Sequence, residues 1–116
     1  MGQPVAWFDI TAKDAPTSRS FYGDLFDWKI DVNEEMQYGM VAAGSSEGIP
    51  GGIGQASEQA LPGIVLYVAV EDAQASLERA ESLGGKTVAP PYDIPTVGKL
   101  AVFTDPDGNR VGLWQR

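Results

Sequence analysis

The sequence contains no cysteine and no histidine among its 116 residues. Without cysteine there is no disulfide framework, no thiol nucleophile and no thiolate ligand for zinc. Without histidine the chain lacks the commonest metal ligand and the usual general base near neutral pH. Any chemistry that this protein performs therefore depends on carboxylates, hydroxyls, amides, amines, aromatic rings or backbone groups.

Positive charge is scarce as well. Eight Lys and Arg residues are set against sixteen Asp and Glu residues, which gives a net charge of −8 and a pI near 4.2. An acidic chain without a basic stripe is a poor partner for a nucleic-acid backbone or an anionic membrane surface. No apolar run reaches the length of a membrane-spanning helix, and the chain opens on strand-like residues, PVAWFDI, rather than on a signal peptide. The sequence thus predicts a cytoplasmic protein that binds neither nucleic acid nor membrane.

A hairpin near the end of the chain, KLAVFTDPDGNRVGLWQ, is the clearest local pattern. Apolar residues from Leu100 and again from Val111 predict two strands. The segment between them has turn chemistry, because Asp105 can accept backbone N–H groups and Pro106 presets its φ angle. Gly108 tolerates the left-handed conformation that such a turn requires.

The chain repeats the order strand, helix and three strands. In the first half, Val5–Thr11 alternates like a strand and Asp14 is placed to cap a helix. In the second half, Ile64–Val70 is apolar and β-branched, and Asp72 takes the same capping position. The halves also end alike, on GIGQ at 52–55 and GLWQ at 112–115. We therefore predict one α+β domain, 1–116, made of two βαβββ modules, 1–58 and 62–116.

Two local details follow from the same patterns. The helical spacing of Phe21, Tyr22 and Leu25 predicts a helix face that packs its aromatic rings against the sheet. In the second module, a short strand at 86–90 is expected to lead into a loop at 91–97.

Taken together, these motifs resemble the vicinal oxygen chelate superfamily, which includes glyoxalase I, extradiol dioxygenases and bleomycin-resistance proteins. The resemblance rests on WFDI, on FYGDLFDW in the first helix, on YVAVEDA and on the final hairpin, so it covers nearly the whole chain. It is nearest to the single-domain branch related to lactoylglutathione lyase. The resemblance implies a curved mixed sheet, a half-barrel with the helices on its outside, and a homodimer.

Many members of that superfamily hold a metal with ligands from the first and last strands of each module. Carried onto this chain, those positions are Trp7, Gly52 or Gly54, Tyr67 and Gly112. None of them is His, Glu, Asp or Gln, and one phenolate does not hold a divalent ion without partners. We therefore expect no metal and no cofactor.

In this family the curved sheet encloses a hollow, the cup, on the side away from the helices. The family geometry, together with the period-two alternation of a strand, places aromatic rings and glycines of this chain inside the cup. Rings supply stacking area and glycines leave room, which suits a flat organic molecule. The residues expected to bind it are Trp7, Asp9, Gly52, Gly54, Tyr67, Gly112 and Trp114. The sequence thus favours a metal-free protein that binds a small molecule.

Asp9 is the candidate for catalysis, because an inward carboxylate is costly unless it is paired, hydrated or functional. It is expected either to pair with Lys99 or a tyrosine hydroxyl, or to have a raised pKa and act as a general base. Two other functions remain open. One is a glyoxalase-like lyase or isomerase, or a dioxygenase-related enzyme, and the other is an interaction module whose aromatic rings fill the cup.

Overall fold

The computed structural model describes residues 2–58 and 60–116, which form two compact units. One unit is Trp7–Ile64. The other combines the N-terminal residues up to Ala6 with Val65–Arg116. The described strands belong to one mixed sheet of eight strands, and each unit contributes four of them and one helix.

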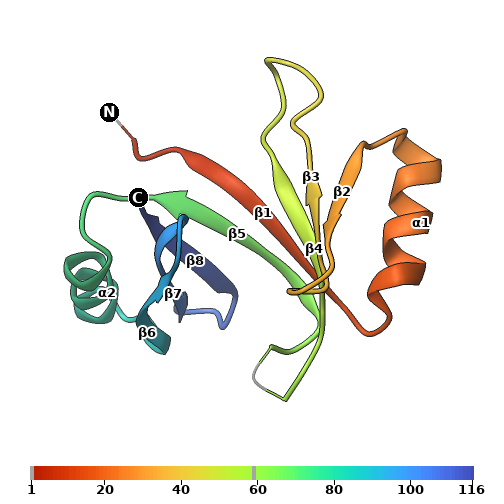
Figure 1. The fold of residues 1–116 in the computed structure, drawn as a ribbon. Coiled ribbons are helices and arrows are strands. Elements are labelled where there is room, and N and C mark those ends of the chain that lie inside the picture. The colour runs from red at the N-terminus through yellow and green to blue at the C-terminus, as the bar shows by residue number, and fades with distance from the viewer. Residues whose placement is uncertain (1, 59) are drawn as a thin grey trace. The chain divides into compact units, whose positions relative to one another are not determined.

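The unit Trp7–Ile64 contains most of the first strand and all of the next four elements (Figure 1). These elements are β1 (Val5–Ala12), α1 (Ala15–Phe26), β2 (Ile30–Asn33), β3 (Tyr38–Val41) and β4 (Gly51–Gln55). The strand order is β2-β3-β4-β1, in which β1 runs parallel to β4 and the other neighbours are antiparallel.

The unit that includes Val65–Arg116 repeats this arrangement. Its elements are β5 (Gly63–Ala69), α2 (Ala73–Ser82), β6 (Lys86–Ile94), β7 (Gly98–Thr104) and β8 (Arg110–Gln115). The strand order is β5-β8-β7-β6, with β5 parallel to β8 and the other neighbours antiparallel. The predicted α+β class, the two βαβββ repeats and the closing hairpin are thereby confirmed. Neither helix of the described chain is long and apolar enough to span a bilayer.

Both helices begin at the predicted capping residues. The side chain of Asp14 accepts a hydrogen bond from the backbone N–H of Thr17 at 3.2 Å, and that of Asp72 accepts one from Ala75 at 3.0 Å. Each cap satisfies a donor that the first turn of a helix leaves unpaired.

A glutamine at the end of each module makes a second contact with the helix start. The Oε1 atom of Gln55 accepts from the backbone N–H of Ala15 at 3.0 Å, and its Nε2 donates to the carbonyl of Lys13 at 2.6 Å. In the other module, Oε1 of Gln115 accepts from the N–H of Ala73 at 2.8 Å. The two modules are therefore alike in structure as well as in sequence, because in each the final glutamine accepts a hydrogen bond from the first residue of the helix.

Replacing Gln55 by alanine should lower the free energy of unfolding by about 1 kcal/mol, because the N–H of the buried Ala15 loses its acceptor. Urea unfolding followed by circular dichroism measures the loss. Gln3→Ala, at an exposed position, is the control and should change stability little. Equal stability of the Gln55 variant and the parent protein would contradict this role.

In each unit, the strands pack one face against the helix of that unit. In the unit Trp7–Ile64 the core includes Ile10, Ala12, Val41 and Ile53, with Phe8, Tyr22, Trp28 and Ile30 packed against them. In the other unit Ala73, Leu77, Ala101 and Leu113 form the core, with Val70 and Phe103 against it. The alternation of β1 is thus read correctly, because Phe8 and Ile10 face the helix side.

Two local predictions were wrong. Phe21 and Leu25 do not pack against the sheet, since 58% of each residue is exposed; only Tyr22 of the predicted face joins the core. The expected loop at 91–97 is strand as far as Ile94, where β6 pairs with β7 through two register shifts. Prolines are tolerated there because β6 is an edge strand, so along one side its backbone N–H groups have no neighbouring strand of the described chain to pair with.

Candidate functional site

The face of β1 that points away from the core carries the residues predicted for the site. Trp7, Asp9 and Thr11 alternate with the core-side residues Phe8 and Ile10, as the pleat requires. In register with them on β4 lie Gly52 opposite Asp9 and Gly54 opposite Thr11. The structure therefore brings together Trp7, Asp9, Gly52 and Gly54, as predicted.

Tyr38 of β3 joins this group and connects its side chains. Its hydroxyl donates to Oδ1 of Asp9 at 2.6 Å, and it accepts from the indole Nε1–H of Trp7 at 3.2 Å. The hydroxyl of Thr11 donates to the other carboxylate oxygen, Oδ2, at 3.1 Å. Four side chains thus form one hydrogen-bonded chain, in which both oxygens of Asp9 have a donor.

The environment of Asp9 raises its pKa above the ordinary value. Burial is the main cause, because it disfavours the charged form, and the hydrogen bonds from Tyr38 and Thr11 oppose it by stabilising the carboxylate. Both expectations for Asp9 are met in part: its partner is a tyrosine hydroxyl, and its pKa moves in the direction that a general base near neutral pH requires.

Removing the Tyr38 hydroxyl should raise the pKa of Asp9 further, because the hydrogen bond that lowers it is lost while the burial remains. We expect the carboxyl ¹³C resonance of Asp9 to titrate at higher pH in Tyr38→Phe than in the parent protein. Tyr22→Phe, in the core on the other face of the sheet, is the control and should leave that titration unchanged. An Asp9 titration unmoved by Tyr38→Phe would contradict the coupling.

The raised pKa also predicts how stability changes with pH. The folded protein binds the Asp9 proton more tightly than the unfolded chain does, so this residue should lower stability as pH rises from the unfolded pKa through the folded one. Asp9→Asn should therefore flatten the fall in unfolding free energy across that window. Urea unfolding at a series of pH values measures it, and an unchanged slope would contradict the shift.

The glycines of β4 do not leave open space, as the glycine pattern had suggested. A Cβ atom at Gly52 would overlap the ring and hydroxyl of Tyr38, and one at Gly54 would lie 2.9 Å from Cδ1 of the same ring. Tyr38 is in register with Gly54 across the β3–β4 pair. The two glycines therefore provide the floor on which the tyrosine ring lies.

The second unit contains a similar pairing. Tyr67 is in register with Gly112, and a Cβ atom at Gly112 would overlap the Tyr67 ring. Trp114 lies on the same side of β8 as Gly112; its indole Nε1–H donates to the carbonyl of Val97 at 3.1 Å, and the guanidinium of Arg116 lies 4.6 Å from its ring centre. These three predicted residues are thus brought together in this unit.

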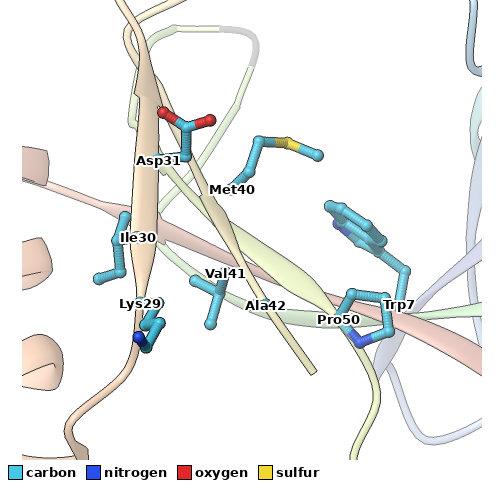
Figure 2. Close-up of a pocket in the computed structure, with 8 residues that line it drawn as sticks. All are labelled: Trp7, Lys29, Ile30, Asp31, Met40, Val41, Ala42 and Pro50. Carbon is cyan, nitrogen blue, oxygen red and sulfur yellow. The ribbon is translucent and has the colours of Figure 1, made fainter. Parts of the chain in front are cut away.

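A pocket of about 430 Å³ lies beside Trp7 within the unit Trp7–Ile64 (Figure 2). Figure 2 shows the side chain of Met40 extending toward the Trp7 indole, with Pro50 next to the indole. The lining residues are Trp7, Lys29, Ile30, Asp31, Met40, Val41, Ala42 and Pro50. This volume falls within the range of sites that hold small organic molecules.

Sequence reasoning missed Tyr38 and Met40, which belong to the same strand. A signal for Tyr38 was present, because an aromatic residue opposite a glycine on a neighbouring strand commonly covers the gap that the glycine leaves. Using that signal requires knowledge of the β3–β4 register. The turn that leads into β3 contains Gln37 at a φ of 52°, a left-handed conformation that a glutamine does not predict.

The fold and this site define an α+β protein with two βαβββ modules and a ligand-sized pocket beside an aromatic ring. The sequence model of the Glyoxalase/Bleomycin resistance protein/Dioxygenase superfamily matches residues 5–113. The chain belongs to this superfamily, which confirms the resemblance.

The curated relative DnrV of Streptomyces peucetius, an anthracycline biosynthesis protein, is 31% identical over 128 residues. The match covers 96% of this chain but 46% of DnrV, so the chain spans about half the length of this relative. Among solved structures, methylmalonyl-CoA epimerase from Mycobacterium tuberculosis has a TM-score of 0.67 at 17% identity, covering 95% of this chain and 85% of the epimerase. A glyoxalase/bleomycin resistance protein/dioxygenase superfamily member from Vibrio splendidus has a TM-score of 0.66 at 15% identity, covering 99% and 100%. These structures share the fold.

The residues at the family's metal positions do not fit a metal. On this chain they are indole, phenol and glycine, and the phenol of Tyr67 lies over Gly112. Within residues 2–58 and 60–116, no three Asp or Glu side chains come together in a way that could hold an ion. Hard cations need several converging oxygen ligands.

Proposed function

We propose that this chain is a metal-free protein that binds a small organic molecule. The observation that carries the proposal is the ligand-sized pocket walled by Trp7, whose indole is held in place by Tyr38. A fixed ring loses little conformational freedom when a flat molecule stacks on it, which favours binding. The residues proposed to contact a ligand in this pocket are Trp7, which was predicted, and Met40. The other predicted residues do not line it: Asp9, Gly52, Gly54, Tyr67, Gly112 and Trp114.

The similarity to DnrV supports a role of this kind. DnrV is named for anthracycline biosynthesis, and a protein of small-molecule biosynthesis is expected to meet small organic molecules. The donor set described above supports the metal-free part of the proposal, since carboxylates and imidazoles are missing from the family's ligand positions.

A thermal-shift screen of aromatic and amphipathic compounds, with metal analysis of the purified protein, tests the proposal. A ligand that binds the folded state raises the apparent melting temperature. Trp7→Ala should abolish the shift, whereas Met36→Ala, which shortens an exposed side chain outside the pocket lining, should keep it. Stoichiometric metal in protein that binds a ligand would contradict the proposal that the protein is metal-free. Thermal shifts that Trp7→Ala leaves unchanged would contradict the proposal that the ligand binds beside Trp7. A screen without any shift would favour an interaction module instead.

A second candidate function is a glyoxalase-like lyase or isomerase, or a dioxygenase-related enzyme. Asp9 supports it, because a half-buried carboxylate with a raised pKa is suited to removing a proton from a substrate. The test uses those screening hits that carry an acidic C–H bond. It measures whether the protein catalyses exchange of that hydrogen for deuterium in D₂O. Exchange that is lost in Asp9→Asn supports an enzyme, and exchange that persists in this variant excludes Asp9 as the base.

We also propose that the chain forms a homodimer in the cytoplasm and binds neither nucleic acid nor membrane. Exposed apolar residues on α1, Phe21 and Leu25, support a protein contact, and the acidic composition supports the absence of nucleic-acid and membrane partners. Light scattering after size-exclusion chromatography measures the mass of the particle, and a monomer at micromolar concentration would contradict the dimer.

A further inference from the structure

The pocket beside Trp7 has apolar walls and two opposite charges on one side. Trp7, Met40 and Pro50 contribute an indole, a thioether and a proline ring. Lys29 and Asp31 also line it, and both are exposed to solvent. An apolar surface beside a few placed charges is the usual composition of a site that orients an organic ligand.

The two charges are independent of each other. Lys29 lies immediately before β2, Asp31 lies within that strand, and both residues line the same pocket. Neither forms an ion pair with any residue in the described part of the chain. Asp31 is in register with Met40 across the β2–β3 pair, and both residues line the pocket. A carboxylate and an ammonium are thus both available to a ligand that lies against Trp7.

We infer that the pocket beside Trp7 takes a planar aromatic zwitterion, whose cation faces Asp31 and whose anion faces Lys29. This inference rests on the proposed function, because it names the ligand class for part of the same site. An aromatic ring would lie against the Trp7 indole and the Met40 thioether, both of which interact well with rings. A ligand with a single charge would match one rim residue and be repelled by the other, whereas a zwitterion matches both.

Four indole probes with the same ring separate these possibilities: L-tryptophan, tryptamine, indole-3-acetate and neutral indole. Binding is followed by NMR through the Nε1–H resonance of Trp7 in ¹⁵N-labelled protein at 0.15 M salt, where long-range attraction to the net charge is screened. We expect L-tryptophan to bind about two- to fivefold more tightly than either singly charged probe, as exposed ion pairs allow.

Charge-removing variants locate the effect. Asp31→Asn should remove the advantage of L-tryptophan over indole-3-acetate, because both ligands then keep only the anion that Lys29 attracts. Lys29→Gln should remove its advantage over tryptamine, because both then keep only the cation that Asp31 attracts. Neutral indole should bind both variants as before. Asp24→Asn and Lys13→Gln change the net charge by the same amounts at exposed positions outside the pocket lining, so they should leave the advantage intact.

Equal affinities of the four probes at Trp7 would overturn the zwitterion inference while leaving small-molecule binding in place. An advantage over indole-3-acetate that survives Asp31→Asn, or an advantage over tryptamine that survives Lys29→Gln, would overturn it as well. If none of the probes moves the Trp7 resonance, the inference fails, and the broader thermal-shift screen decides separately whether the protein binds a small molecule of another kind.

Discussion

Gly52→Ala is expected to destabilise the protein by about 1–3 kcal/mol, the range for overpacking a filled site. The added methyl group would overlap the hydroxyl and ring of Tyr38, which lies on the glycine and donates to Asp9. The ring therefore has to move, and the 2.6 Å hydrogen bond between Tyr38 and Asp9 should be lost with it. Urea unfolding measures the first effect, and the NMR titration of Asp9 measures the second.

Two controls make the Gly52 result specific. In a Tyr38→Ala background the same substitution should cost much less, because the ring that collides with it is gone, so a double-mutant cycle isolates the contact. Gly23→Ala in α1 should instead stabilise by up to about 1 kcal/mol. Its Cβ atom would meet Ile30 Cδ1 and the Trp28 carbonyl at an ordinary 3.7 Å. An equal cost of Gly52→Ala in both backgrounds would rule out the Tyr38 contact as the cause.

Ile53→Ala is expected to have the largest effect on stability, a loss of about 2–5 kcal/mol. Ile53 is the largest side chain that is completely buried, at 0% exposure, and it lies in the core of the unit Trp7–Ile64. Truncation removes three buried carbon atoms and leaves a cavity that a close-packed sheet and helix cannot fill. The free energy of unfolding, obtained from urea titration, measures the loss.

Matched substitutions show whether burial is the cause. Ile53→Val removes one carbon atom from the same place and should cost about 0.5–1.5 kcal/mol. Ile64→Ala makes the same chemical change at a residue that is 62% exposed, so it should alter stability by about 0.5 kcal/mol or less. A loss at Ile64 as large as that at Ile53 would show that side-chain burial does not set the cost.

The local rules of the chain were enough to predict the architecture. Asp14 and Asp72 cap the helices because a side-chain oxygen at that position meets unpaired backbone donors, and this depends on residues three apart. Alternation places Trp7 and Asp9 on one face of β1, and the apolar residues Phe8 and Ile10 on the other identify the face that packs against the helix. The closing turn is equally local, since Asp105 accepts from the backbone N–H groups of Asp107 and Asn109, both at 2.9 Å.

The sequence could not predict which residues meet across paired strands, or which apolar side chains of a helix are buried and which are exposed. Tyr38 reaches Asp9 across 29 positions of the chain, and a shift of one residue in β3 would turn its ring to the opposite face. The exposed Phe21 carries the same helical spacing as the packed Tyr22, so periodicity alone could not separate them. The pocket beside Trp7 depends on both kinds of information, because its other walls come from β2, β3 and Pro50.

The placement of the Tyr38 ring on Gly52 also constrains how this sequence can evolve. Any residue larger than glycine at position 52 has to displace the ring first, so a single codon change there would damage folding before it could add a new function. A carboxylate or imidazole could be introduced at that position only after, or together with, a smaller residue at position 38. The present pairing is therefore an evolutionary barrier that requires two mutations to cross.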